Sequence, residues 1–79
     1  MQNEELLRRI VTAAEICGGQ PCIRGTRILV STVLDGLVEG LSSEQIIDHY
    51  PSLKPDNIRA AVAHGAELAR ENVWKVNVR

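Results

Sequence analysis

Aromatic side chains are nearly absent from this sequence: it contains no phenylalanine, one tyrosine (Tyr50) and one tryptophan (Trp74). The core of the fold must therefore consist of aliphatic side chains. The chain has 79 residues, and a domain of this size buries only about 60 % of the surface that its unfolded chain exposes. We therefore expect its stability to be shared with a partner or with a second copy of the chain.

Long apolar segments are also missing. No run approaches the roughly 20 apolar residues that a membrane-spanning helix needs. The first five residues, from Met1 to Glu5, lack the basic and apolar regions of a signal peptide. We therefore expect a cytoplasmic protein without membrane contact, in which Cys17 and Cys22 are reduced thiols.

The formal net charge of −1 argues against a general binder of polyanions. The charges are unevenly distributed, because residues 30–53 hold four acidic side chains and no lysine or arginine. Residues 1–29 hold four basic and three acidic side chains, and residues 54–79 hold five and three. A nucleic-acid contact would therefore have to use the two ends of the chain.

Two segments in the first third of the chain, Ile10–Thr12 and Cys22–Val30, are rich in β-branched or apolar residues. The Gly18–Pro21 stretch between them predicts a turn. Gly25 interrupts the second segment and indicates a bulge or a close backbone approach. The pattern predicts a short, irregular β-hairpin.

Apolar residues at helical spacing predict a helix from about Ser31 to Glu39. Gly40 should end it, with Leu41 placed for the apolar contact of a Schellman-type terminus. Ser42 and Gln45 then have the spacing of a capping box, which predicts the start of a second helix.

Pro55 suits the first position of a third helix, which we expect to run to about Glu71. Its small residues Ala61, Gly65 and Ala69 permit the close approach of another helix, from this chain or another. The sequence thus predicts one mostly α domain. It comprises a β element and turn over residues 9–30, a three-helix, helix-turn-helix-like core over 31–71 and a C-terminal tail over 72–79.

Residues 73–78 alternate apolar and polar side chains, as strands do. This tail could add a strand to the sheet of a partner, with Trp74 as its anchor. It could equally pair with the N-terminal strand of its own chain, since Ile10 and Val11 need a neighbour. The sequence leaves both options open.

The run from Ile16 to Ile28 reads ICGGQPCIRGTRI. It resembles the hallmark of the domain-of-unknown-function 433 family, which is a glycine pair, a proline and then Ile-Arg-Gly-Thr-Arg-Ile. The later segments, including the Gly-Leu-Ser junction at residues 40–42 and the Tyr-Pro pair at 50–51, match in the same order. The resemblance covers roughly residues 9–70 and departs from the family pattern at Lys54, where a threonine N-cap is expected.

The resemblance implies a helix-turn-helix-like domain similar to VapB-type antitoxins, which are paired with PIN-like toxins that cut RNA. We therefore expect a non-catalytic protein that neutralises a PIN-like ribonuclease toxin, with autoregulation through operator DNA as a further role and a homo-oligomer as its assembly. The alternatives are a stand-alone homodimeric helix-turn-helix regulator that binds DNA, and a purely structural interaction module on the same fold.

Four residues are candidates for DNA or anion binding: Arg24, Thr26, Arg27 and Arg59. The first three surround Gly25, where two guanidinium groups and a hydroxyl flank a position that another backbone can approach. The alternative is structural, with Arg24 and Arg27 paired to carboxylates that fix the hairpin on the first long helix. These carboxylates would be Glu15, Asp35 or Glu39.

Basic side chains near the C-terminus would suit the acidic metal site of a PIN-like toxin. The candidates for partner binding are Arg70, Trp74, Lys75, Val76 and Arg79.

Two cysteines and two histidines could in principle form a zinc site: Cys17, Cys22, His49 and His64. The thiols have C-x4-C spacing and the histidines fall in separate predicted helices, which is not a zinc pattern. No local motif places a base beside either thiol. We expect no metal, no cofactor and no catalytic activity.

Overall fold

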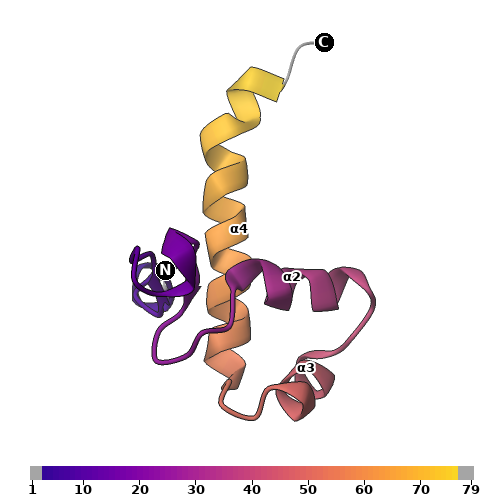
Figure 1. Ribbon diagram of the computed structural model, residues 1–79. Helices are drawn as coiled ribbons and strands as arrows, with labels where there is room; N and C mark the ends of the chain where they lie inside the picture. The colour runs from indigo at the N-terminus through magenta and orange to yellow at the C-terminus, as the bar shows by residue number, and fades with distance from the viewer. Residues whose placement is uncertain (1–2, 77–79) are drawn as a thin grey trace.

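The longest helix, α4 (Pro55–Val76), forms the axis of the molecule (Figure 1). The structure is a computed structural model that describes the backbone of residues 3–76 and the side chains of residues 4–71. It confirms a mostly helical fold with a short N-terminal hairpin. None of the helices within these residues combines the length and the apolar character needed to cross a membrane.

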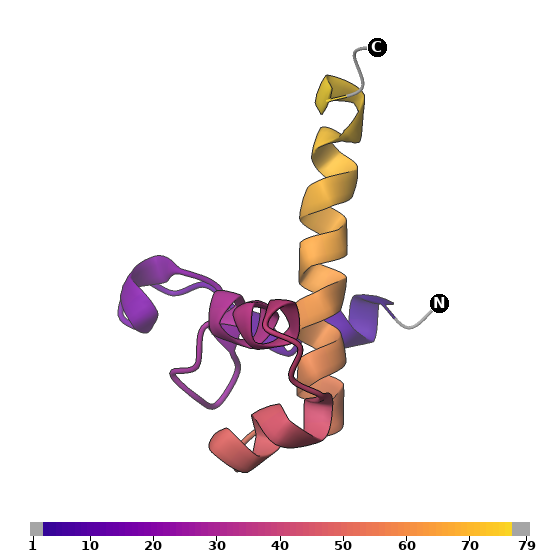
Figure 2. The ribbon, with the colours of Figure 1, turned by 90° about the vertical axis from the view of Figure 1, so that its right-hand side faces the viewer.

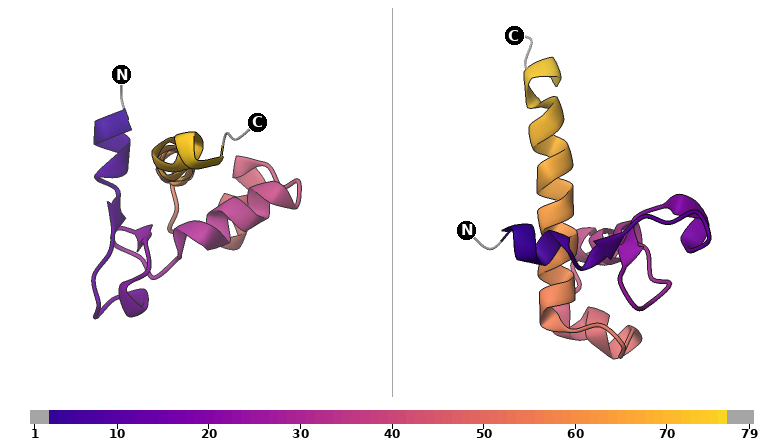
Figure 3. Two further views of the ribbon diagram at one scale, coloured as in Figure 1. Left: turned by 90° about the horizontal axis from the view of Figure 1, so that it is seen from above. Right: turned by 90° about the vertical axis from the view of Figure 1, so that its left-hand side faces the viewer.

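The other helices surround the first half of α4. In the view from above, α1 (Asn3–Leu7) and α2 (Val30–Val38) lie on different sides of α4 (Figure 3). The short helix α3 (Ser43–His49) packs against both α2 and the start of α4. The second half of α4 projects beyond all of them (Figure 2).

The predicted hairpin is confirmed, although its strands are very short. β1 (Ile10–Val11) pairs antiparallel with β2 (Cys22–Ile23). A single 3-10 turn, η1 (Cys17–Gly19), lies in the loop between them. β2 ends at Ile23 because the chain turns back at Gly25, whose φ is +83°, so that the Ile23 N–H donates to the Ile28 carbonyl at 2.9 Å.

The end of α2 is the predicted Schellman motif. Gly40 has a φ of +96°, a left-handed conformation that glycine adopts without steric cost. The N–H of Leu41 donates to the Gly36 carbonyl and the N–H of Gly40 donates to the Leu37 carbonyl, both at 3.0 Å. Two carbonyls that the last helical turn leaves unsatisfied thereby gain donors.

The predicted capping box at the start of α3 is also present. The Ser42 hydroxyl accepts a hydrogen bond from the Gln45 N–H at 3.1 Å, and the Gln45 side-chain oxygen accepts one from the Ser42 N–H at 2.9 Å. These two bonds fix the sharp change of direction between α2 and α3.

α4 begins at Pro55, as predicted, but its cap is not the expected one. Lys54 stands at the N-cap and offers no short polar side chain. Instead, the side-chain oxygen of Asn57 accepts a hydrogen bond from the Lys54 N–H at 2.7 Å. Asn57 is only 7 % exposed, so this bond also satisfies a polar group that would be costly to bury alone.

The core is aliphatic, as the composition requires. Its main cluster lies between the hairpin, α2, α3 and α4 and consists of Ile23, Val30, Val33, Ile46, Leu53, Ile58 and Ala61. A second cluster joins Leu6 of α1 to Ala60 and Ala63 of α4. A Cβ at Gly65 would lie 3.5 Å from Leu34 Cδ1, so the small residues at this part of α4 accommodate α2 of the same chain.

Two features differ from the sequence-based expectations. α1 was not predicted, because its five residues carry too little apolar periodicity and it is held by Leu6 against α4. The strand predicted over residues 73–78 is wrong for residues 73–76, which continue α4. Extending an existing helix avoids the cost of nucleating a new element, and the last residues of the predicted strand, 77–78, lie outside the described residues.

Replacing Ser42 by alanine should lower the free energy of unfolding by about 1 kcal/mol, because it removes the acceptor for the Gln45 N–H. Urea unfolding followed by circular dichroism measures this change. Ser43→Ala, one residue further on, is the matched control and should leave stability nearly unchanged. Equal effects of the two substitutions would contradict the role of the capping box.

Candidate functional site

A cleft of about 480 Å³ opens where α1, the residues after it, the turn after β2 and the first turns of α4 meet. Leu6 and Asn57 contribute to its walls. Its charged lining is dominated by guanidinium groups, with four arginines against two carboxylates: Arg8, Arg9, Arg24, Arg59, Glu5 and Asp56.

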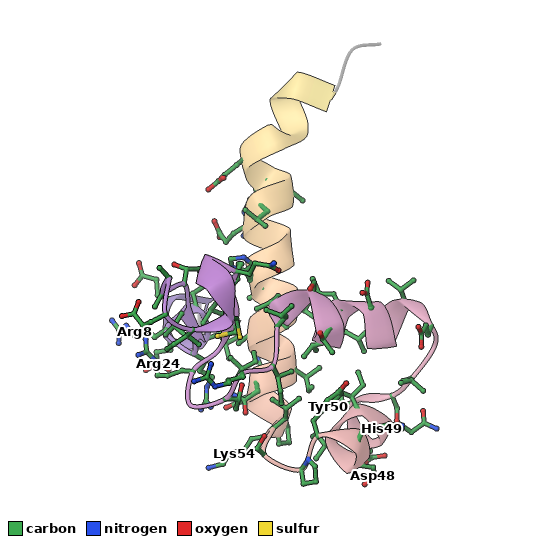
Figure 4. The ribbon with its side chains drawn as sticks, viewed as in Figure 1. Arg8, Arg24, Asp48, His49, Tyr50 and Lys54 are labelled. Atoms are coloured by element: carbon green, nitrogen blue, oxygen red, sulfur yellow. The ribbon has the colours of Figure 1, made fainter. Side chains whose placement is uncertain are left out.

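Arg24 ties the hairpin to the segment after α1. Its N–H donates to the Arg9 carbonyl at 2.7 Å, and its Nε donates to the Arg8 carbonyl at 2.8 Å. The labelled side chains of Arg8 and Arg24 lie next to each other in Figure 4. Residues 16 positions apart in sequence are thus brought to one wall of the cleft.

Asp56 lies between two of the arginines. Its Oδ2 is 3.7 Å from Arg9 Nη2, and its Oδ1 is 3.2 Å from Arg59 Nη1. The side chain of Asp56 is about half exposed, and ion pairs at such positions contribute only about 0–1 kcal/mol. Among the described residues, no carboxylate is paired with Arg8 or Arg24, so the positive charge of these two groups is available to an anion.

The structure separates the residues that the sequence suggested for anion binding. Arg24 and Arg59 line the cleft, whereas Arg27 lines a separate shallow hollow of about 260 Å³ with Gly25 and Thr26. The Thr26 hydroxyl donates to the Ile23 carbonyl at 2.8 Å and accepts from the Ile28 N–H at 3.0 Å. The hydroxyl of Thr26 therefore closes the turn.

The alternative pairing of Arg24 and Arg27 with carboxylates of the first long helix is not observed. Within the described side chains, neither arginine forms an ion pair with Glu15, Asp35 or Glu39. Arg24 stabilises the hairpin through backbone carbonyls instead.

Arg8 and Arg9 were not identified from the sequence. They are adjacent in the sequence, just before β1. They count among the basic residues of the first 29 residues, but no sequence pattern assigned them to a site. Their place in the cleft depends on the packing of α1 against α4, which local patterns do not reveal.

Four of the five residues proposed for partner binding, all except Arg79, belong to the projecting half of α4. Arg70 is ion-paired with Glu67 on the exposed surface of the helix. Trp74, Lys75 and Val76 belong to the last turn of α4, but their side chains lie outside the described part, as does the whole of Arg79.

The two thiols belong to η1 and β2 of the hairpin, whereas His49 is the last residue of α3. Burial, together with a hydrogen bond to Cys17, raises the pKa of the Cys22 thiol. His49 Nδ1 is 3.0 Å from the Gln45 carbonyl of its own helix. Across the side chains that the structure describes, no three His, Cys, Asp or Glu residues are grouped so as to hold a metal ion.

The first half of α4 offers little free surface for reading bases. In a helix-turn-helix protein, the first turns of the second helix of the motif enter the major groove. Here Ala60 and Ala63 are buried beneath α1, and Asn57 caps its own helix. Arg59 is the exposed cation on these turns, and it lines the cleft together with the other three arginines. Grouped guanidinium groups of this kind suit phosphates more than base edges.

The fold is that of a small helical domain with a two-stranded hairpin, and comparison with known proteins defines its class. The model of the family described as "Protein of unknown function (DUF433)" matches residues 10–64. The chain belongs to this family. α1, Arg8 and Arg9 precede the matched residues, so the cleft is built partly from residues outside the family match.

The chain is similar to a solved structure and to a curated bacterial protein. A crystal structure of a DUF433 member protein from Anabaena variabilis is similar to this chain with a TM-score of 0.69 and 30 % sequence identity, over 91 % of this chain and 70 % of that one. The uncharacterized protein y4eO of Sinorhizobium fredii is 42 % identical over 55 residues, which make up 68 % of this chain. The match covers 25 % of that protein, so this chain corresponds to about a quarter of its length.

Proposed function

We propose that this protein is an antitoxin-like binding protein that neutralises a PIN-like ribonuclease and binds the operator DNA of its own operon. The observation that carries the proposal is the division of the molecule into two surfaces. One is the cleft with its four arginines, and the other is the half of α4 that projects beyond the remaining elements (Figure 2).

The projecting half of α4 supports the protein-binding part of the proposal. A helix that extends away from its own domain can lie along a second protein without rearrangement of the core. Arg70 and Lys75 belong to this part of α4, and Arg79 follows in the sequence. Their charge is complementary to the carboxylates that surround the metal site of a PIN-like nuclease.

The cleft supports the DNA-binding part. Guanidinium groups form charge-assisted hydrogen bonds with phosphate oxygens, and Arg8 and Arg24 have no carboxylate partner among the described residues. A single cleft of this size supplies few phosphate contacts. Tight operator binding therefore requires two or more copies of the chain, which agrees with the expected homo-oligomer.

The second candidate function is a stand-alone homodimeric regulator that binds DNA. The cleft favours it as well, since phosphate binding there needs no ribonuclease. The two candidates differ in whether the projecting half of α4 has a protein partner.

Removal of residues 73–79 should abolish inhibition of the ribonuclease. The full chain, co-expressed with a PIN-like nuclease encoded beside its gene, should co-elute with it in size-exclusion chromatography and suppress RNA cleavage. The shortened chain should do neither, while circular dichroism shows its fold intact. Lys75→Ala should weaken inhibition and Lys54→Ala, at the opposite end of α4, should not. Full inhibition by the shortened chain would contradict the proposal.

Arg8→Ala should lower the affinity for duplex DNA by roughly 10- to 150-fold, because a lost charge-assisted contact costs about 1.5–3 kcal/mol. The slope of log K against log salt should fall by about 0.9 for each phosphate contact removed. Fluorescence anisotropy at several salt concentrations measures both quantities. Arg27→Ala is the matched control, since Arg27 lies outside the cleft. Equal losses for Arg8→Ala and Arg27→Ala would show that the cleft is not the contact surface.

A further inference from the structure

The two cysteines of the chain lie together at the hairpin loop. Cys17 Sγ donates to the Arg27 carbonyl at 3.2 Å. Cys22 Sγ lies 3.9 Å from the carbonyl of Thr26, the residue before Arg27. The two sulfur atoms thus meet the carbonyls of consecutive residues in one turn. Interaction with the Cys17 thiol also contributes, after burial, to the raised pKa of Cys22.

The backbone at Cys17 is strained. Its φ of +55° makes it the one non-glycine residue with positive φ in the part of the chain that the structure describes. A left-handed conformation costs an L-residue roughly 1–2 kcal/mol. Gly18 and Gly19 follow with φ of +66° and +86°. This left-handed turn carries the Cys17 thiol back towards β2, where Cys22 lies.

The two thiols differ in access. Cys22 has no exposed surface, whereas Cys17 is only partly buried. An oxidant in solution therefore meets Cys17 first, and Cys22 is placed behind it. A partly exposed thiol with a second thiol beside it is the arrangement of a peroxide-sensitive cysteine and its resolving partner.

We propose that Cys17 and Cys22 form an intramolecular disulfide when the protein is oxidised by a hydroperoxide. The Cys17 sulfur attacks the peroxide, the O–O bond breaks, and Cys17 becomes a sulfenic acid while the second peroxide oxygen leaves as water or an alcohol. The Cys22 sulfur then attacks the Cys17 sulfur. The S–O bond breaks, the S–S bond forms, and the hydroxyl leaves with the Cys22 proton as water.

The disulfide changes the turn that carries Arg24. Reduced thiols contact the carbonyls of Thr26 and Arg27, and disulfide formation removes both S–H donors from this turn. The bond also closes the Cys17–Cys22 loop covalently. This chemistry is independent of the ribonuclease and of DNA.

Mass spectrometry of peroxide-treated protein tests the proposal. Trypsin should release residues 10–24 as one peptide, since no lysine or arginine lies between Arg9 and Arg24, and this peptide holds both cysteines. After treatment with hydrogen peroxide, unfolding and alkylation, we expect this peptide to lack both alkyl groups and to have lost two hydrogen atoms. Dithiothreitol should restore two alkylatable thiols.

Two variants serve as controls. In Cys22→Ala, treatment should leave Cys17 as a sulfenic acid, trapped by dimedone, whereas in Cys17→Ser the buried Cys22 should remain unmodified. The proposal is overturned if the wild-type peptide carries a sulfinic acid in place of the disulfide, or if Cys17 joins two chains to each other. It is also overturned if both thiols survive a peroxide dose that oxidises Cys17 in Cys22→Ala.

Discussion

The structure depends on the small side chains in the first half of α4. Ala60 and Ala61 have no exposed surface and Ala63 is 7 % exposed, so α4 is buried from two directions. Larger residues would hold α1 or α2 away from the helix, since close-packed cores tolerate little added volume. The alanine face under α1 matters most for the cleft, because α1 leads directly into Arg8 and Arg9, which face Arg24 and the start of α4.

The elements that the sequence predicted correctly are those fixed by local chemistry. The capping box of Ser42 and Gln45 and the glycine terminus at Gly40 each depend on residues a few positions apart, and each was found as expected. α1 and the helix cap at Asn57 depend on contacts that the local pattern does not contain. The cap is one half of a capping box: the side chain of Asn57, the third helical residue, accepts from the N–H of Lys54 at the N-cap. Lys54 has no short polar side chain to form the other half.

The candidate site also depends on tertiary contacts that the local sequence pattern does not contain. Arg24 and Arg27 are three residues apart, and the sequence grouped them because they flank one glycine. The turn at Gly25 sends them to different surfaces, and Arg24 instead meets Arg8 and Arg9 from before the hairpin. Tertiary packing assembles this cluster from basic residues in separate segments. The sequence does not predict it, because the overall charge of the chain is close to neutral and no segment is strongly basic.

The central claim is that docking of α1 on α4 assembles the arginine-lined cleft, which we propose binds the phosphates of DNA. The most direct measurement is the DNA affinity of Leu6→Ala, which removes the side chain that holds α1 on the alanine face, compared with Val38→Ala, an 84 % exposed residue near the end of α2. We predict a several-fold loss of affinity for Leu6→Ala, at unchanged α-helix content of the core, and none for Val38→Ala. Wild-type affinity in Leu6→Ala would contradict the account.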